Sequence, residues 1–151
     1  MKTIAEALYA VAITLWIGGM WTIGYLVAPV LFTLSDRVLA GSLAGKLFTL
    51  ISYVGMGCAA YLVLFRLGRF GGSCFKQGAF WIILLMLGLV LVGEYGVQPL
   101  LASLKNQALP REVMESVFRD RFSTWHGVAS VLYLIESVLG AILVWLQART
   151  R

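Results

Sequence analysis

Charged residues are scarce in this sequence of 151 residues: they make up 13% of the chain, whereas hydrophobic residues make up 60%. Ordinary soluble domains carry about 25% charged residues. A membrane-spanning helix needs about 20 mostly apolar residues, because the hydrocarbon core of a bilayer is about 30 Å thick. Four runs approach or exceed that length, at about 7–32, 47–65, 78–101 and 122–147. The sequence therefore predicts an all-α, integral membrane four-helix bundle, organised as a single four-span domain over residues 1–151.

Polar faces are also missing, since the first two runs contain no charged residue. Each helix of a soluble bundle needs a polar face, so a soluble bundle is excluded. The net charge of +5 does not indicate nucleic-acid binding, because the basic residues flank the apolar runs and no nucleic-acid motif is present. The lipid bilayer is the partner that this pattern predicts.

The loop charges bear on orientation. Lysine and arginine are balanced, with six on each side of the membrane. The loop between the second and third runs, at 66–77, is short, basic and free of acidic residues. Short loops weigh most in the positive-inside rule, so we expect this loop and both termini to lie in the cytoplasm.

The connections contain few helix breakers, because the chain has only three prolines. Pro29 is predicted to kink the first span near its end or to mark its exit. The segment PREVMESVFRDRF, at 110–122, has acidic residues early and arginines late, as the helix dipole favours. It predicts a short amphipathic helix between the third and fourth spans. No clear internal repeat is evident.

Cysteine and histidine are rare, with two cysteines and one histidine. Cys58 and Cys74 fall at different depths, which predicts two unbridged thiols. A closed zinc site needs more ligands than His126 alone supplies, whereas one histidine suffices as an axial ligand of haem, and His126 is also the ligand for a copper alternative. The sequence contains no nucleophile–base pair, phosphate loop or cofactor fingerprint, which favours a non-enzymatic role.

Three ionisable residues lie inside the predicted spans: Glu94, His126 and Glu136. Such residues are costly in a membrane, so they are functional candidates by default. Glu94 lies about one turn before the end of the third span and His126 about one turn after the start of the fourth. These ends face the same side of the membrane, so we expect the two side chains to lie at similar depth.

The depth and helical spacing predict a polar cluster that faces the bundle interior. Its expected members are Tyr25, Glu94, Gln98, His126, Ser130 and Tyr133. Two interpretations stay open: a site for a proton, metal or small ligand, or an interhelical hydrogen-bond network that only stabilises the bundle. Arg119 and Arg121 are expected as partners of Glu94. Glu136 is expected to face either the bundle or a second subunit.

Several motifs together resemble a known family. They are LWIGGMWTIGYLVAPVLF, AGKLFTLISYVGMGCAA, EYGVQPLL and RFSTWHGVASVLYLI. Over about 7–147 the chain resembles the bacterial domain of unknown function 4149 family, which is related to eukaryotic transmembrane protein 205. The resemblance implies the fold and a bacterial inner-membrane location, but no activity. The human relative is associated with platinum-drug resistance and with transport or secretion.

The pattern WIGG is also similar to the first span of copper-resistance D proteins and HemJ-type protoporphyrinogen oxidases, which use additional histidines that this chain lacks. Three functions therefore stay open. The first is a binding or transport-related protein with a site around Glu94 and His126. The second is a haem- or copper-dependent redox protein, and the third is a structural subunit of a larger membrane complex. We expect a homo-oligomer or a subunit of such a complex.

Overall fold

A computed structural model describes residues 4–34, 36–107 and 115–149, and these residues are almost entirely helical. The elements follow one another as α1 (Ile4–Thr22), η1 (Ile23–Val27), α2 (Ala28–Leu34), α3 (Arg37–Phe70), η2 (Gly71–Lys76), α4 (Gly78–Leu91), η3 (Val92–Val97), α5 (Gln98–Gln107) and α6 (Glu115–Arg149). The segments η1 and η3 are π-helical, and η2 is a 3-10 helix. No strand occurs in the described part of the chain.

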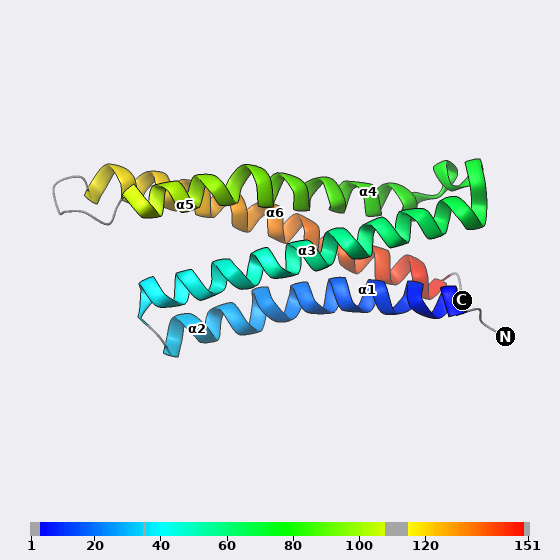
Figure 1. Cartoon of the computed structure of the whole chain (residues 1–151), viewed down its shortest axis with the longest axis horizontal. Coiled ribbons are helices and arrows are strands. Elements are labelled where there is room, and N and C mark those ends of the chain that lie inside the picture. Colours follow the sequence, from blue (N-terminus) through cyan, green and yellow to red (C-terminus); the bar gives the residue numbers. More distant parts are fainter. Residues whose placement is uncertain (1–3, 35, 108–114, 150–151) are drawn as a thin grey trace.

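Among the described residues, four helices are long and apolar enough to cross a membrane. They extend over Ile4–Leu34, Leu39–Lys76, Gly78–Leu104 and Ser123–Arg149. They pack against one another in a bundle (Figure 1), so the predicted fold class is confirmed. The helices extend past the apolar runs because the polar residues at their ends continue the helical turn, whereas the span prediction counted apolar residues only.

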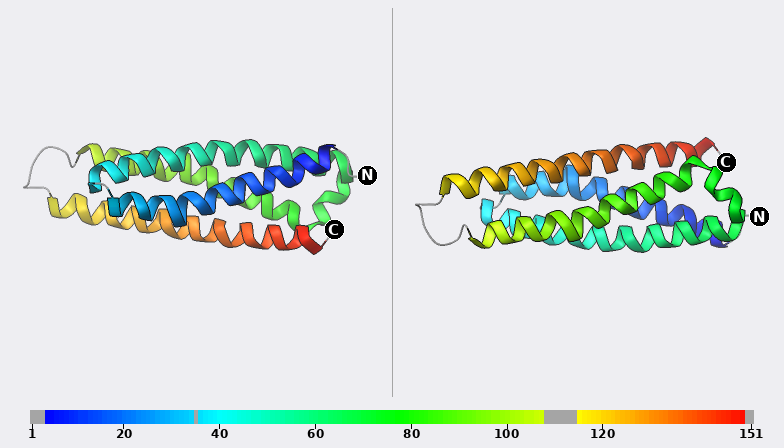
Figure 2. Two further views of the ribbon diagram at one scale, coloured as in Figure 1. Left: turned by 90° about the horizontal axis from the view of Figure 1, so that it is seen from below. Right: turned by 90° about the horizontal axis from the view of Figure 1, so that it is seen from above.

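The helices form a ring in which each packs on two neighbours. Helix α1 contacts α3 and α6, and α4 contacts the same two helices. The start of α1, the segment η2 and the end of α6 lie at one end of the bundle in all views (Figures 1 and 2). The junction of α2 with α3 lies at the opposite end, together with the end of α5 and the start of α6.

The bundle interior is apolar and closely packed. Its fully buried large side chains are Trp16, Ile17, Met20, Leu62, Ile83, Met86 and Leu143. The outer faces are equally apolar: Leu15, Leu85 and Leu134 are each more than half exposed. Helices that are apolar all round suit a lipid environment, so the exposed leucines follow from a membrane location.

The helices α1–α2 and α4–α5 are each interrupted by a π-helical segment before a proline. Proline lacks an N–H and its ring collides with the carbonyl four residues earlier. A wider turn relieves this collision. The N–H of Ala28, before Pro29, donates to the carbonyl of Ile23, and the N–H of Gln98, before Pro99, donates to the carbonyl of Gly93. The disturbance expected at Pro29 therefore takes the form of a π segment.

The two π segments belong to a short internal repeat, contrary to the expectation that the chain has none. The pattern Tyr-x-Val-x-Pro-x-Leu occurs at 25–31 and again at 95–101. Helices α1 and α4 run in the same direction (Figure 1), and each is followed by a long antiparallel helix. In the ring, α1 lies opposite α4 and α3 lies opposite α6. Two helix hairpins related by an approximate two-fold axis along the bundle account for this arrangement.

The segment expected to form an amphipathic helix is part of α6. Residues 110–114 lie outside the described residues, while 115–122 form the first turns of α6 and continue into the fourth span without a break. The sequence from Arg111 to His126 contains no glycine or proline that would end a helix. The described part of the segment is helical as predicted, but it is not a separate element.

Candidate functional site

Glu94 lies in the π segment η3, where the third span is widened. Its side chain is half-buried, and its Oε2 atom is the one fully buried side-chain nitrogen or oxygen without a hydrogen-bond partner among the described residues. Arg121 is exposed and forms no ion pair with Glu94; the side chain of Arg119 lies outside the described ones. A carboxylate oxygen is thus held inside the protein without a donor or counter-ion in the described part of the chain.

Two tyrosines lie next to Glu94. Tyr53 on α3 lies close enough to interact electrostatically with both Tyr95 and Glu94. Both tyrosine side chains are more than half exposed, at 53% and 61%. Their hydroxyls therefore provide polar groups beside the carboxylate that a ligand arriving from outside the bundle is able to contact.

Tyr25 and Tyr133, two of the predicted site residues, lie in contact. Their rings are 6.1 Å apart between centroids and meet edge to face. The Tyr25 hydroxyl donates a hydrogen bond of 3.0 Å to Oγ of Ser137 on α6, and the Tyr133 hydroxyl donates to the carbonyl of Met20 on α1. These bonds join the first span, at η1 and the end of α1, to α6.

The same contact involves residues that the predicted cluster omitted. Ser137 is buried and accepts the bond from Tyr25. Glu136 is only 8% exposed and lies near the buried indole of Trp16, so it faces the bundle. Ser137 follows Tyr133 by four residues, and this spacing places both side chains on the same face of α6. For Glu136, the sequence left both the bundle and a second subunit open.

The remaining predicted site residues lie on α5 and α6. His126 is exposed, and Ser130 donates a 2.9 Å hydrogen bond to the backbone carbonyl of His126 on its own helix. Gln98 is half-buried at the start of α5. The segment η3 packs against α6, but the pairing of Glu94 with His126 stays a prediction.

The two halves of the repeat differ in the residue that precedes the shared tyrosine. Gly24 occupies this position in the first half, and a Cβ atom there would lie 2.7 Å from Cζ of the Tyr133 ring. Glu94 occupies it in the second half. The space beside position 24 is therefore occupied by the Tyr133 ring, whereas the equivalent position in the second half of the repeat carries the Glu94 carboxyl group.

Metal ligands are sparse in the described structure. No group of three or more His, Cys, Asp or Glu side chains is placed to hold a metal ion among the residues searched. Cys58 and Cys74 are both buried and unbridged, as their different depths predicted. Haem or copper bound through His126 stays a prediction.

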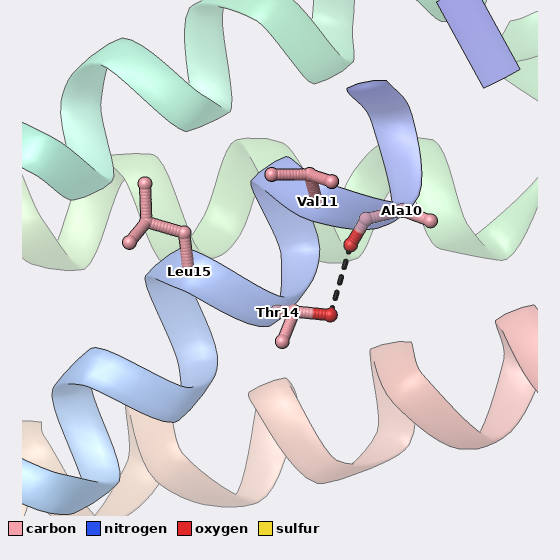
Figure 3. A pocket seen from close by; sticks show the side chains of 4 residues that line it. All are labelled: Ala10, Val11, Thr14 and Leu15. Carbon is pink, nitrogen blue, oxygen red and sulfur yellow. Dashed lines mark hydrogen bonds between the residues drawn. The ribbon is translucent and has the colours of Figure 1, made fainter. Parts of the chain in front are cut away.

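A shallow depression lies on the outer face of α1 (Figure 3) and is lined by Ala10, Val11, Thr14 and Leu15. The Thr14 hydroxyl donates a 3.0 Å hydrogen bond to the carbonyl of Ala10. The only side-chain polar group in this lining is therefore engaged within its own helix, and the depression offers a ligand mainly apolar contacts.

Comparison with known protein families identifies one family that matches most of this chain. The model of a family described as a domain of unknown function (DUF4149) matches residues 11–110. The chain belongs to the DUF4149 family. The DUF4149 match includes both π segments and Glu94, and it ends before α6. Comparisons with curated proteins and with solved structures find no significant match.

Proposed function

We propose that this DUF4149 protein is a non-enzymatic, transport-related membrane protein that binds a proton or a small monovalent cation at Glu94. The observation that carries the proposal is the buried, unpartnered Oε2 atom of Glu94 inside a helix long and apolar enough to span a membrane. A bare carboxylate in hydrocarbon is costly. A bound proton or cation removes that cost, and its release restores it, which makes the carboxyl group a switchable site.

The π segment around Glu94 supports this proposal. Such segments are rare and are frequently found at functional sites. Interrupted helices also supply backbone carbonyls to ion sites in transporters that are built from repeats. Here the interruption, the repeat and the carboxylate coincide in η3, beside the hydroxyls of Tyr53 and Tyr95.

The proposed site extends toward α6. Gln98 follows Glu94 by four residues on the same chain segment, and His126 and Ser130 lie on the helix that packs against η3. A histidine near a carboxylate is suited to pass a proton between the site and the membrane surface. Tyr25 and Tyr133 belong to the corresponding region of the first half, where they join α1 to α6.

We place the protein in the bacterial inner membrane with both termini in the cytoplasm. The support is the acid-free basic loop at 66–77, which lies at the same end of the bundle as the start of α1 and the end of α6. The resemblance to transmembrane protein 205 adds a link to transport. Assembly as a homo-oligomer, or as a subunit of a larger complex, is part of the same proposal.

The test uses dicyclohexylcarbodiimide, an apolar reagent that modifies protonated carboxyl groups within membranes. We expect the peptide containing Glu94 to be labelled in purified protein, with labelling that falls as pH rises and as sodium or potassium is added. Glu94→Gln should abolish this labelling, while Glu136→Gln, which changes a buried carboxyl group on the fourth span, should leave it intact. The proposal would be overturned if labelling of Glu94 depended neither on pH nor on added cations, or if Glu94 were not labelled under any of these conditions.

A further inference from the structure

A second polar site lies at the opposite end of the bundle, around Arg66. This residue is near the end of α3, beside η2 and the start of α4. Its side chain is only 9% exposed, which makes it the one buried basic side chain among those described. Arginine is rarely buried without a partner, so its surroundings decide what it does.

Contacts from three parts of the chain fix the Arg66 guanidinium. Its Nε atom donates a 2.9 Å hydrogen bond to the hydroxyl of Tyr9 on α1, and Nη1 donates to Oε1 of Gln77. The guanidinium carbon also lies 5.6 Å from the ring centroid of Tyr9 and 6.0 Å from that of Phe70. All these partners are neutral, so they orient the cation without balancing its charge.

The acidic residue nearest along this end of the bundle is already engaged. Glu6 forms a 3.2 Å ion pair with Arg69, and no described carboxylate pairs with Arg66. The Nη2 atom of Arg66 makes no hydrogen bond within the described structure, and it is not fully buried. Its N–H groups therefore reach the surface, where they are free to bind an anion.

The rest of this end favours a negatively charged ligand. Residues 66–77 contain Arg66, Arg69 and Lys76 and no acidic residue. Trp81 and Trp145 are more than half exposed near this end, and tryptophan marks the level of the lipid headgroups. Arg66 is thus expected at the depth where phosphate groups are found.

We propose that Arg66 is the centre of a binding site for an anionic phosphate group. Guanidinium groups match phosphate geometry through paired N–H donors, and basic pockets between membrane helices bind anionic headgroups. The phosphate belongs either to an anionic phospholipid or to a free phosphate compound. The site uses residues unrelated to Glu94, so its failure would leave the proposed function untouched.

The experiment measures thermal stabilisation of the full chain in detergent. The added ligands are phosphatidylglycerol, phosphatidylcholine as a neutral lipid, and inorganic phosphate. We expect phosphatidylglycerol to raise the apparent melting temperature of the wild type more than phosphatidylcholine does. Stabilisation by inorganic phosphate as well would identify a free phosphate compound as the source, and its absence would identify a lipid headgroup.

Two variants distinguish specific binding at Arg66 from general attraction by the positive charge of this loop. Arg66→Gln should weaken phosphatidylglycerol binding about tenfold or more, because it removes charged hydrogen bonds. Arg69→Gln also removes one positive charge from this loop, but it should retain the response because Arg69 is exposed and paired with Glu6. Equal stabilisation of wild type and Arg66→Gln, or no preference for an anionic ligand, would overturn the proposal.

A third variant covers the case in which Arg66→Gln does not fold. Arg66→Lys keeps the charge and loses the forked donor geometry. Native mass spectrometry should then show fewer phosphatidylglycerol molecules retained by Arg66→Lys than by Arg69→Lys. Equal retention by the two lysine variants would reject Arg66 as the centre of the site.

Discussion

Gly24 shows how one missing side chain decides the packing of two helices. The ring of Tyr133 on α6 occupies the space where a Cβ atom of residue 24 would be, and the Tyr133 hydroxyl reaches the carbonyl of Met20 one turn earlier. A methyl group at position 24 therefore forces either the ring or the helix to move. The close approach of η1 and α6 depends on this glycine.

We predict that Gly24→Ala destabilises the protein by about 1–3 kcal/mol, the usual cost of overpacking. The matched control is Gly18→Ala on the same span, since nothing lies within 4 Å of a Cβ atom there. A lower apparent melting temperature in detergent for Gly24→Ala, with little change for Gly18→Ala, is the expected result. Equal effects at the two positions would show that Tyr133 is free to move aside.

Individual side chains of the site were predictable to different degrees. Tyr25 and Tyr133 were expected in one cluster, and the structure brings them together. Ser137, four residues after Tyr133 on α6, joins them through its bond with Tyr25. The orientation of Glu136 toward Trp16 depends on how α6 is rotated within the bundle. The sequence leaves that rotation undetermined, because α6 carries apolar residues on every face.

At the scale of elements, the two π segments are the features that depart from regular helix. Each ends just before the residue that precedes a proline, and each shifts the following turns by one residue relative to an unbroken helix. Hydrophobic run lengths predicted the spans. They did not predict the π segments, because a single extra residue in a helical turn leaves the pattern of apolar residues almost unchanged.

We predict that Pro99→Ala tightens η3. Alanine restores an N–H that is able to donate to the carbonyl of residue 95, which favours an ordinary α-helical turn. Backbone amides at 92–98 should then exchange with deuterium more slowly, by about tenfold if the turn gains roughly 1.4 kcal/mol. Labelling of Glu94 by the carbodiimide should change in the same variant.

Pro29→Ala is the control for this experiment. It makes the same change in η1, where Gly24 replaces the carboxylate. Slower exchange should appear at 23–28 without any change in the labelling of Glu94. An exchange pattern in Pro99→Ala identical to that of the wild type would show that neighbouring helices, rather than proline, maintain the π segment.

At the scale of the whole molecule, the two proposed sites lie toward opposite ends of one bundle. Arg66 lies at the end that holds η2, while η3 lies in the half of α4–α5 that approaches the other end (Figure 1). The even number of spans predicted that both termini share a side, and the positions of α1 and α6 agree with this. The side itself was assigned from the acid-free basic loop at 66–77, and thiol labelling tests this assignment directly.

The burial of both native thiols makes that measurement simple. Cys58 is 9% exposed and Cys74 is fully buried, so a membrane-impermeant maleimide should leave the wild type almost unmodified in intact cells. Ser103 on α5 and Ser73 in η2 are exposed positions at opposite ends of the bundle. Ser103→Cys should be labelled from outside the cytoplasmic membrane, and Ser73→Cys only after lysis. The reverse pattern would invert the orientation, and in either case each signal would come from a single introduced thiol against a silent background.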